Sequence, residues 1–384
     1  METKTIVFIA LTVISFLISW LGNRFLISYL IKKNQLDTPN ERSSHTKLTP
    51  RGGGRAIFVS IFISLSIYCL YAQNLDLFIL LFISSVIAML GWIDDLRNSR
   101  GGLGSGIRSL IQLFCAIGVV IYFGPVLYLP LPSPLDISLG WLKYLIAIIW
   151  IIGITNIYNF LDGIDGHAGT QGFIAGLGLF IFSFNEFNSE PFNNQNITGL
   201  IIAASCLGFL MVNWHPAKIF LGDVGSTFLG FLLSSYPFYI QKQNDYFNTI
   251  IEHDFQGHLN TSFASFLNSH AANAFYAMAI LIWFFLLDGT FTMIRRAIKR
   301  EKVWKPHRSH LYQRLNIAGW KHSQIVLFIS LLYTIILVYQ GLVYGFVEMS
   351  PKWDTIVLAL ICFIVLILVT FYVERKHKST KALH

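Results

Sequence analysis

Long apolar runs constrain this chain more than any other feature of its sequence. The segment 355–373 (TIVLALICFIVLILVTFYV) carries no charge, and about 20 apolar residues are enough to cross the hydrocarbon core of a bilayer as a helix. Backbone polar groups in lipid must be hydrogen-bonded within the chain, so such segments form helices. We therefore predict an all-α, polytopic membrane protein with about eleven transmembrane helices. The predicted spans, the sixth of them short, are 5–31, 56–73, 77–93, 108–130, 138–159, 171–185, 198–214, 225–241, 271–295, 324–346 and 355–373.

Composition favours a single membrane domain over residues 1–384. The chain is 54% hydrophobic and 12% charged, whereas charged residues make up about 25% of a typical soluble domain. The first apolar run is long and no small-x-small cleavage site follows it, so we interpret it as a retained span. The chemical motifs lie between 42 and 315, and a last span at 355–373 and a basic tail at 374–384 come after them. The cysteines lie in apolar runs without a CxxC pair, which predicts reduced thiols: Cys69, Cys115, Cys206 and Cys362.

Basic residues are distributed unevenly between the two sets of loops. Taking the gaps between spans in order places 23 of the 28 Lys and Arg on one side of the membrane. The positive-inside rule makes that side cytoplasmic, so we expect the N-terminus outside and the C-terminus inside. Topology and anionic lipid head groups then explain the net charge of +8, and no nucleic acid partner is needed.

Carboxylate and amide side chains gather in three motifs on the predicted cytoplasmic side. Each motif alone has a simpler explanation as a solvated or capped helix end. Together, hard oxygen donors at short spacing are typical of Mg²⁺ or Mn²⁺ sites and unsuited to zinc. The residues are Asp94 and Asp95 in GWIDDLRNSR, Asn156, Asn159, Asp162 and Asp165 in NIYNFLDGIDG, and Asp223 in KIFLGDVGS.

The second motif spaces four polar residues at an interval of three. In a helix, Asn156, Asn159 and Asp162 would form a drifting polar stripe. The glycines of DGIDG would then let the backbone turn and bring Asp165 round to the same ligand site. Asp223 stands between glycines where the next apolar run begins, which predicts a helix start with N–H groups available to an anion.

Two basic motifs lie on the same side. In RGGGR, the glycines would let the backbone approach a ligand, and Arg51 and Arg55 suit phosphate oxygens. No GK[ST] follows, so this is not a Walker A loop. In KPHRSHLYQRL, His307, Arg308 and His310 would clamp a pyrophosphate, and zinc is disfavoured because the loop has no thiol. Ordinary basic loops are the simpler alternative, but the combination predicts a metal between carboxylates that face a polyphosphate.

These motifs, in order, resemble one enzyme family. SSHTKLTPRGGG, IDD, NIYNFLDGIDG, KIFLGDVGS, LLDGTFTMIRR and HRSHLYQRL are similar to motifs of the polyprenyl-phosphate N-acetylhexosamine-1-phosphate transferases over residues 42–315. That family includes initiators of O-antigen and teichoic-acid synthesis and phospho-MurNAc-pentapeptide translocase. The resemblance implies an enzyme of the bacterial cytoplasmic membrane that moves HexNAc-1-phosphate from a UDP-HexNAc to undecaprenyl phosphate. It implies release of UMP and a need for Mg²⁺ or Mn²⁺, and it leaves the oligomeric state open, a homodimer included.

The resemblance also implies roles for individual residues. Asp223 would bind the metal, Asp94 would act as a base for the lipid phosphate or guide it, and Asp95 would support the metal or the charge balance. A two-step route through an aspartyl intermediate stays open. Asp288 matches an acidic position of the family and would face the site or an arginine such as Arg295. The other expected contacts are Asn156, Asn159, Asp162 and Asp165 with the nucleotide sugar, His307, Arg308 and His310 with phosphate, and Arg51 and Arg55 with the lipid phosphate.

The sequence departs from the family pattern at two places. His167 follows DGIDG where the family usually has an aliphatic residue, and we expect it either to contact the sugar or to face solvent at a helix start. Tyr312 and Gln313 stand where the teichoic-acid enzymes have histidines. This second difference favours a HexNAc donor of the O-antigen type and leaves the exact sugar open.

Three alternatives compete with this interpretation. A phospho-MurNAc-pentapeptide donor fits the general chemistry but not the histidine pattern of the last motif. A secondary transporter of an anionic metabolite should carry ionisable residues at mid-membrane within repeated halves, and neither feature is visible. A structural membrane protein would have no need of the carboxylates.

Overall fold

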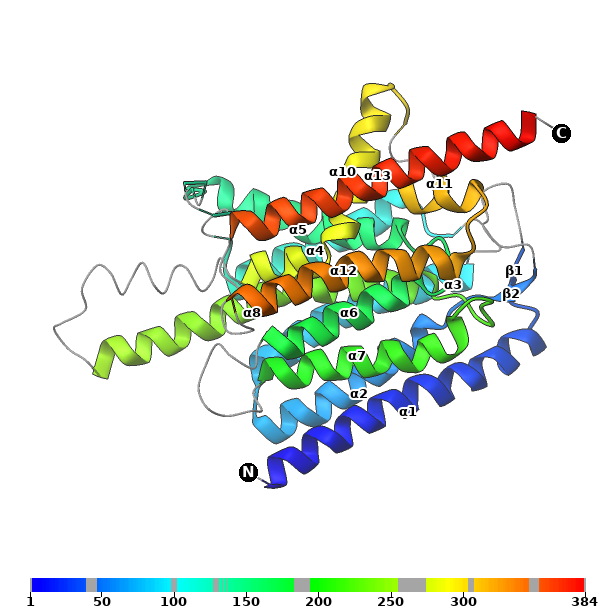
Figure 1. Ribbon diagram of the computed structural model, residues 1–384. Coiled ribbons are helices and arrows are strands. Elements are labelled where there is room, and N and C mark those ends of the chain that lie inside the picture. The colour runs from blue at the N-terminus through cyan, green and yellow to red at the C-terminus, as the bar shows by residue number, and fades with distance from the viewer. Residues whose placement is uncertain are drawn as a thin grey trace.

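The computed structural model is a bundle of helices with one short hairpin-like sheet (Figure 1). The residues it describes are 2–38, 47–97, 102–126, 131–132, 134–135, 137–182, 194–254, 274–302, 307–344 and 352–382. Residues 43–46 of the first motif and 255–270 of the longest predicted outer loop lie outside them. The helices are α1 (Glu2–Lys32), α2 (Gly54–Ala72), α3 (Leu75–Arg97), α4 (Ser105–Phe123), α5 (Leu142–Phe160), α6 (His167–Phe182), α7 (Asn194–Asn213), α8 (Gly222–Asp254), α10 (Trp283–Ile298), α11 (Leu311–Ile317), α12 (His322–Tyr344) and α13 (Trp353–Ala382).

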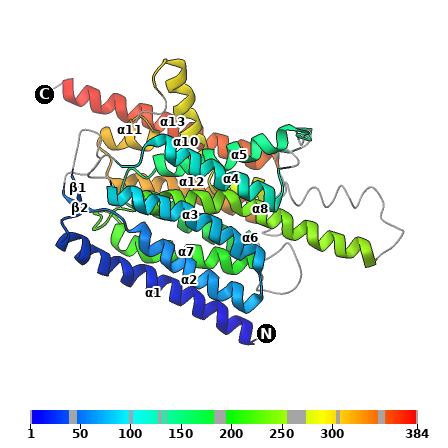
Figure 2. The ribbon, with the colours of Figure 1, turned by 180° about the vertical axis from the view of Figure 1, so that it is seen from behind.

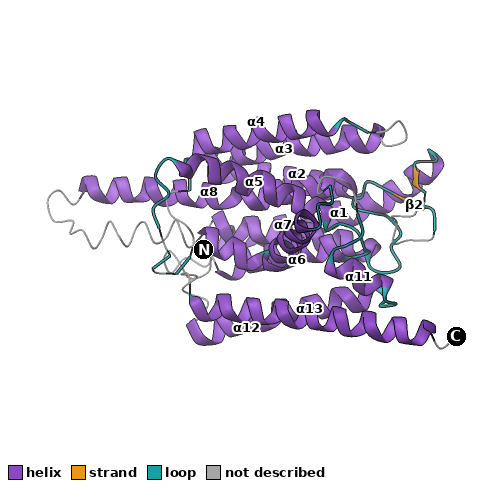
Figure 3. Cartoon of the chain, turned by 90° about the horizontal axis from the view of Figure 1, so that it is seen from above, coloured by secondary structure: helices purple, strands orange, loops and turns teal. Residues whose placement is uncertain are grey.

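Successive long helices run in opposite directions, as short connections require. The two-residue strands β1 (Leu36–Asp37) and β2 (Thr49–Pro50) pair antiparallel at one end of the bundle. Figure 1 and Figure 2 place the starts of α2 and α8 and the end of α3 at this same end, which we call the β end. The N-terminus lies at the opposite end and the C-terminus at the β end. Seen from above, α3 and α4 lie along one edge of the bundle and α12 and α13 along the other (Figure 3).

The all-α prediction is confirmed, while the count of eleven spans is not. Within the described residues, eight helices are long and apolar enough to cross a membrane, and a bent pair makes nine. That pair, Ala274–Leu281 and Trp283–Ile298, turns by 74°, so the ninth span predicted at 271–295 is interrupted near its middle. Ile282 between them adopts φ −119° and ψ 18°, which interrupts the helix. α6 has only 16 residues and α8 becomes polar in its second half.

The outer surface of the bundle is apolar. Leu70, Ile121 and Leu342 are each about 80% exposed, and contiguous exposed apolar surface of this kind marks contact with lipid or another protein. Inside, large aromatic side chains such as Phe209, Phe228 and Tyr236 are fully buried. The four cysteines are free, as predicted from their surroundings.

The last helix extends further than the sequence indicated. α13 continues to Ala382 through the segment predicted to be a basic tail. There Glu374 accepts two hydrogen bonds of 2.7 Å from Arg314 of α11. The guanidinium of Arg314 also lies 4.7 Å from the ring centroid of Phe371. The extra C-terminal span therefore holds α11 against the bundle.

Glycines allow three helices to meet at the β end. A Cβ atom at Gly91 of α3 would lie 2.7 Å from the carbonyl oxygen of Asp223. A Cβ atom at Gly54 would collide with the backbone of Gly225. The starts of α2 and α8 and the end of α3 are thus in backbone contact, and this contact sets the carboxylates of α3 beside Asp223.

Candidate active site

Asp95 caps the helix that carries Asp223. The backbone N–H of Asp223 donates to Asp95 Oδ1 at 3.1 Å, and that of Val224 donates to Oδ2 at 3.3 Å. The first N–H groups of a helix have no partner within the helix, so a carboxylate there stabilises the helix start. The side chain of Asp95 is 2% exposed. Asp95 therefore stabilises the start of α8 and the guanidinium of Arg51. Both of its carboxylate oxygens already accept hydrogen bonds from these partners.

Asp223 lies between two arginines. Its Oδ1 accepts from Arg51 Nη2 at 2.6 Å and from Asn159 Nδ2 at 3.3 Å, and its Oδ2 lies 3.5 Å from Arg108 Nη1. Arg51 reaches Asp95 as well, through Nε at 3.2 Å. Two guanidinium groups thus balance the negative charge of a site at the end of membrane helices, where unpaired charge is costly.

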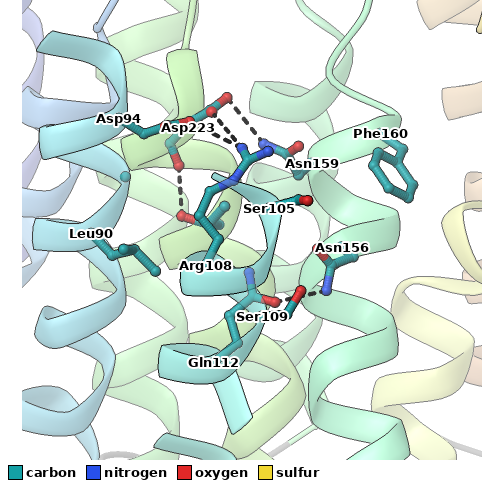
Figure 4. A pocket seen from close by; sticks show the side chains of 12 residues that line it. Leu90, Asp94, Ser105, Arg108, Ser109, Gln112, Asn156, Asn159, Phe160 and Asp223 are labelled. Carbon is teal, nitrogen blue, oxygen red and sulfur yellow. Dashed lines mark hydrogen bonds and ion pairs between the residues drawn. The ribbon is translucent and has the colours of Figure 1, made fainter. Parts of the chain in front are cut away.

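Asp94 shares Arg108 with Asp223. Arg108 Nη1 donates to Asp94 Oδ2 at 3.0 Å, and the backbone N–H of Leu103 donates to Oδ1. Asp94, Arg108 and Asp223 border a cavity of about 180 Å³, the small cavity, shown in Figure 4. Asn156 also lines it, and there its Nδ2 donates to Gln112 Oε1 at 2.9 Å. The structure therefore brings together four predicted residues, Asp94, Asn156, Asn159 and Asp223, in one place.

The donor set of the small cavity fits a hard divalent cation. Asp94 and Asp223 supply carboxylate oxygens, the ligand type that Mg²⁺ takes, and Asn159 supports Asp223 through its Nδ2. Arginine cannot coordinate a metal, so Arg51 and Arg108 act as counter-charges. Mg²⁺ typically keeps several waters and only one or two carboxylates, which a cavity of this size accommodates.

The glycines of the RGGGR motif serve packing, and their N–H groups are not available to a ligand. The N–H groups of Gly52 and Gly53 donate to Phe220 O at 3.0 and 2.8 Å, and that of Gly54 donates to Leu221 O at 2.8 Å. The expectation that this backbone is free to approach a ligand is therefore wrong. Arg55 is 5% exposed and lies over the ring of Trp92, 5.4 Å from its centroid. Neither Arg51 nor Arg55 lines the small cavity.

The NIYNFLDGIDG motif divides between two cavities. α5 ends at Phe160, and Gly166, with φ +77°, turns the chain as predicted. The turn does not return Asp165 to the small cavity, however; it places Asp165 in a second one. Asp162 is half-buried and lines neither cavity. Burial and the nearby carboxylates of Asp223 and Asp95 raise its pKa to about 7, although Arg51 opposes this rise.

The second cavity is larger, about 490 Å³, and we call it the large cavity. Asp165 Oδ2 lies 2.7 Å from His215 Nδ1 and 3.2 Å from His322 Nδ1, and it accepts from the backbone N–H of Ala217 at 3.2 Å. Burial alone would raise the pKa of Asp165, but the neighbouring imidazoles of His322 and His215 and the N–H of Ala217 lower it overall. Within the described residues, these three side chains are the one group of three or more His, Cys, Asp or Glu whose ligand atoms all lie within 4.8 Å of one another, close enough to hold a metal ion.

Two parallel backbone segments join the cavities. Thr49 and Phe220 line the large cavity, and Arg51 forms a parallel bridge with Phe220. Phe220 N donates to Pro50 O at 2.8 Å. Two residues beyond Thr49 stands Arg51, and three beyond Phe220 stands Asp223, so the same two segments lead from the large cavity to the arginine and carboxylate beside the small one.

Comparison with known proteins decides the family. The pattern of glycosyl transferase family 4 matches residues 77–240. A phospho-N-acetylmuramoyl-pentapeptide-transferase of Chlorobium phaeobacteroides is 31% identical over 264 residues, covering 61% of this chain and 71% of that protein. The chain belongs to glycosyl transferase family 4. The chain is also 28% identical over 345 residues to a probable undecaprenyl-phosphate N-acetylglucosaminyl 1-phosphate transferase of Bacillus subtilis, which covers 89% of this chain and 83% of that protein.

A third relative is named for a different lipid. A decaprenyl-phosphate N-acetylglucosaminephosphotransferase of Mycobacterium leprae is 28% identical over 322 residues, covering 76% of this chain and 73% of that protein. With its apolar helices and these relatives, this family 4 transferase is a multi-pass membrane enzyme.

The last histidine motif of this family 4 enzyme lines neither cavity. His307 Nδ1 bonds to Ser309 Oγ at 2.9 Å, and its ring stacks on that of His310 with centroids 4.9 Å apart. Burial and the neighbouring His310 lower the pKa of His307 to about 4, so it is neutral near pH 7. His307 therefore brings no positive charge of its own to the clamp predicted from the sequence, and phosphate contacts by Arg308 and His310 stay predictions.

Asp288 pairs differently from the expectation. It is fully buried, its Oδ1 accepts from the backbone N–H of Leu311 at 3.0 Å, and its Oδ2 lies 3.6 Å from His310 Nδ1. Arg295, the partner proposed from sequence, donates instead to Ser309 O at 2.5 Å. Asp288 thus stabilises the start of α11 through the free N–H groups there.

The residues that depart from the family pattern serve internal contacts. Tyr312 donates to Phe160 O at 3.2 Å, and Gln313 Oε1 accepts from His310 N at 3.4 Å. His167 is 3% exposed, its Nδ1 lies 2.9 Å from Leu161 O, and its ring packs 4.7 Å from that of Tyr312. The solvent-facing alternative for His167 is therefore wrong, and it lines neither of the two cavities described above, so its proposed sugar contact lacks geometric support.

Sequence reasoning missed three side chains that stand at the cavities. From the sequence, Arg108 served only in the count of basic residues that sets the membrane topology. In the structure it lies one helical turn before Gln112 and donates to Asp94. His215 immediately precedes the PAKIFLGD segment, and His322 begins α12. They stand 50 and 157 residues from Asp165 in sequence, so no local spacing could have revealed them.

Proposed function

We propose that this enzyme transfers HexNAc-1-phosphate from a UDP-HexNAc to undecaprenyl phosphate and releases UMP, in the bacterial cytoplasmic membrane. The observation that carries the proposal is the small cavity at the end of the membrane helices. There Asp94 and Asp223 share Arg108. Carboxylates with counter-arginines suit a metal and phosphates, and the names of the relatives from Bacillus subtilis and Mycobacterium leprae give polyprenyl phosphates as their substrates.

The two cavities match two parts of the donor. The large cavity falls within the range of about 300–1,000 Å³ that is usual for small-molecule sites, and the small one is nearer the size of phosphate groups. We assign the nucleotide to the large cavity beside Asp165, and the pyrophosphate to the path along Arg51 toward Asp223. Asn159, bonded to Asp223, then contacts the donor near its phosphates.

The reaction exchanges one P–O bond for another at the phosphorus that bears the sugar. An oxygen of the lipid phosphate attacks the phosphorus that bears the sugar, and the bond from that phosphorus to the bridging oxygen breaks, so UMP departs with that oxygen. A phosphate monoester has its second pKa near 6, so the acceptor needs little help from a base. Asp94, held by Arg108 and Leu103, guides the acceptor or takes its last proton.

Charge balance is the main task of this chain's side chains. Asp223 and Asp94 would hold Mg²⁺ or Mn²⁺, which supplies neutralisation of the pyrophosphate charge when bound. Arg51 and Arg108 lie on the same carboxylates, and their guanidinium groups suit phosphate oxygens in two-point contact. Asp95 keeps α8 in place, so the carboxylate of Asp223 stays aimed at the small cavity.

The donor and the cellular role follow from the sequence pattern. Tyr312 and Gln313 replace the histidines of the teichoic-acid type, so we favour a UDP-HexNAc of the kind that begins O-antigen or related cell-envelope polysaccharides. From the basic loops we infer that the β end faces the cytoplasm, where UDP-sugars are made. A homodimer is compatible with the apolar outer surface of the bundle.

The product lipid tests this proposal. Purified enzyme with undecaprenyl phosphate and Mg²⁺ should convert one or more of UDP-GlcNAc, UDP-GalNAc and 6-deoxy-HexNAc donors into a lipid whose mass equals undecaprenyl pyrophosphate plus the residue of the sugar transferred. UDP-MurNAc-pentapeptide should give no product. A lipid product from UDP-MurNAc-pentapeptide alone would contradict the assignment of the donor.

A further inference from the structure

Two histidines and one aspartate meet at the edge of the large cavity. His215 comes from the segment before α8, His322 from the start of α12, and Asp165 from the turn between α5 and α6. One ligand atom from each lies within 4.8 Å of the others. Nothing in the phosphoryl transfer proposed above uses this trio of side chains as a set.

The distances suit a metal with nitrogen ligands. Ligands about 2.05 Å from a tetrahedral zinc ion lie about 3.3 Å apart. Asp165 Oδ2 and His322 Nδ1 are 3.2 Å apart, and Asp165 Oδ2 and His215 Nδ1 are 2.7 Å apart. A shift of about half an ångström would therefore bring the second pair to this separation.

His322 Nδ1 lies close to both a hydrogen-bond donor and a carboxylate oxygen of Asp165. His322 Nδ1 lies 3.2 Å from the backbone nitrogen of Asp165, whose N–H donates to it, and 3.2 Å from Asp165 Oδ2. A nitrogen that accepts from N–H carries a lone pair and no proton. Its lone pair and the carboxylate oxygen are then two electron-rich atoms in contact, an arrangement that a cation between them stabilises.

We propose that Asp165, His215 and His322 form a site for a zinc-class divalent metal ion, separate from the Mg²⁺ site at Asp223. Two imidazoles and one carboxylate are the ligand set of open zinc and iron sites, whereas Mg²⁺ prefers oxygen alone. The Ala217 N–H to Asp165 Oδ2 supplies an outer hydrogen bond to a ligand. The open coordination positions face the large cavity, which gives the ion a path of entry.

The surroundings allow a cation despite two nearby lysines. Lys47 and Lys321 line the same cavity, but both are exposed, so water screens their charge. Asp165 is 8% exposed and His322 5% exposed, while about a third of the His215 side chain is exposed. Two ligands are thus held by the fold, and the third can adjust to the ion.

Cobalt is the probe that distinguishes this site from a Mg²⁺ site. Co²⁺ held by nitrogen ligands at low coordination number absorbs visible light far more strongly than hydrated Co²⁺. Purified full-length enzyme in detergent, with excess Mg²⁺ to fill oxygen sites, should show one saturable absorption per chain on titration with Co²⁺, and Zn²⁺ should abolish it. No substrate is present, so the result does not depend on the proposed transfer reaction.

Variants assign the absorption to these side chains. His215→Ala should weaken Co²⁺ binding at least about 100-fold, the upper end of what loss of an outer hydrogen bond costs a metal site. His322→Ala should abolish it. His307→Ala is the matched control, because it removes a half-buried histidine outside the trio, and Asp223→Asn should likewise retain the signal. Thermal unfolding without metal checks that each variant is folded, and the exposed His215 keeps the test decisive if His322→Ala fails to fold.

The proposal fails on any of three results. The wild type could give no visible absorption beyond that of hydrated Co²⁺. His215→Ala could bind Co²⁺ as tightly as the wild type. The signal could also disappear in Asp223→Asn while it persists in His215→Ala, which would place the ion in the small cavity.

Discussion

Arg51 Nη2 lies 2.6 Å from Asp223 Oδ1, and this contact joins residues 172 positions apart in the chain. The same guanidinium reaches Asp95 through Nε at 3.2 Å. One side chain from the segment after β2 therefore holds both the carboxylate that caps α8 and the carboxylate proposed to bind the metal. Its position links the start of α2, the end of α3 and the start of α8.

Replacing Arg51 by lysine should separate charge from geometry. A lysine keeps the positive charge but cannot form two directed contacts from one planar group. We expect Arg51→Lys to lower kcat/KM at least about 10-fold and to destabilise the enzyme by about 1.5–3 kcal/mol, the value of one hydrogen bond to a charged group. Transfer assays and thermal unfolding measure the two effects, and wild-type values for both would show that the double contact is unimportant.

The packing of α3 on α8 gives a second prediction. A Cβ atom at Gly91 would meet Asp223 O at 2.7 Å, so Gly91→Ala should push the two helices apart. Overpacking typically costs about 1–3 kcal/mol, and activity should fall as Asp223 moves. Gly153→Ala in α5 is the matched control, since a Cβ atom there would meet no atom within 4 Å. Equal losses of stability and activity in the two variants would contradict this explanation.

The pKa of Asp162 predicts a pH dependence. Burial and neighbouring carboxylates raise that pKa to about 7, so Asp162 is neutral in mild acid and gains its charge as the pH rises through 7. The added negative charge favours a cation at Asp223. Since kcat/KM reports the free enzyme, its value should rise with pH through about 7, and Asp162→Asn should remove that inflection. An unchanged profile in Asp162→Asn would assign the titration to another group.

Much of the fold was predictable, because apolar length specifies membrane helices without knowledge of the tertiary structure. The gathering of Asp94, Asn159 and Asp223 was predictable too, since alternating spans bring those three helix ends to one side. The packing role of the RGGGR glycines was not predictable. A Cβ atom at Gly54 would collide with α8, a helix far away in the chain. The path of Asp165 into the large cavity depends on the direction of one turn at Gly166, which the sequence leaves free.

Orientation in the membrane is the fourth prediction. Lys299 follows α10 on the predicted cytoplasmic side, and Leu135 lies in the gap between α4 and α5 on the predicted outer side; both are exposed. In intact cells, an impermeant maleimide should label Leu135→Cys at once and Lys299→Cys only after lysis. The unmodified protein, whose four cysteines lie in apolar helices, gives the background. The reverse pattern of labelling would invert the topology.

UMP release by the purified enzyme tests the central claim most directly. With undecaprenyl phosphate, a UDP-HexNAc and Mg²⁺, we predict one UMP for each lipid product, with no UDP formed and no UMP when the lipid phosphate or the metal is left out. Asp223→Asn should remain folded and release no UMP over a wide range of Mg²⁺ concentrations. Release of UDP in place of UMP, or normal activity of Asp223→Asn at ordinary Mg²⁺, would contradict a phosphoryl transfer centred on Asp223.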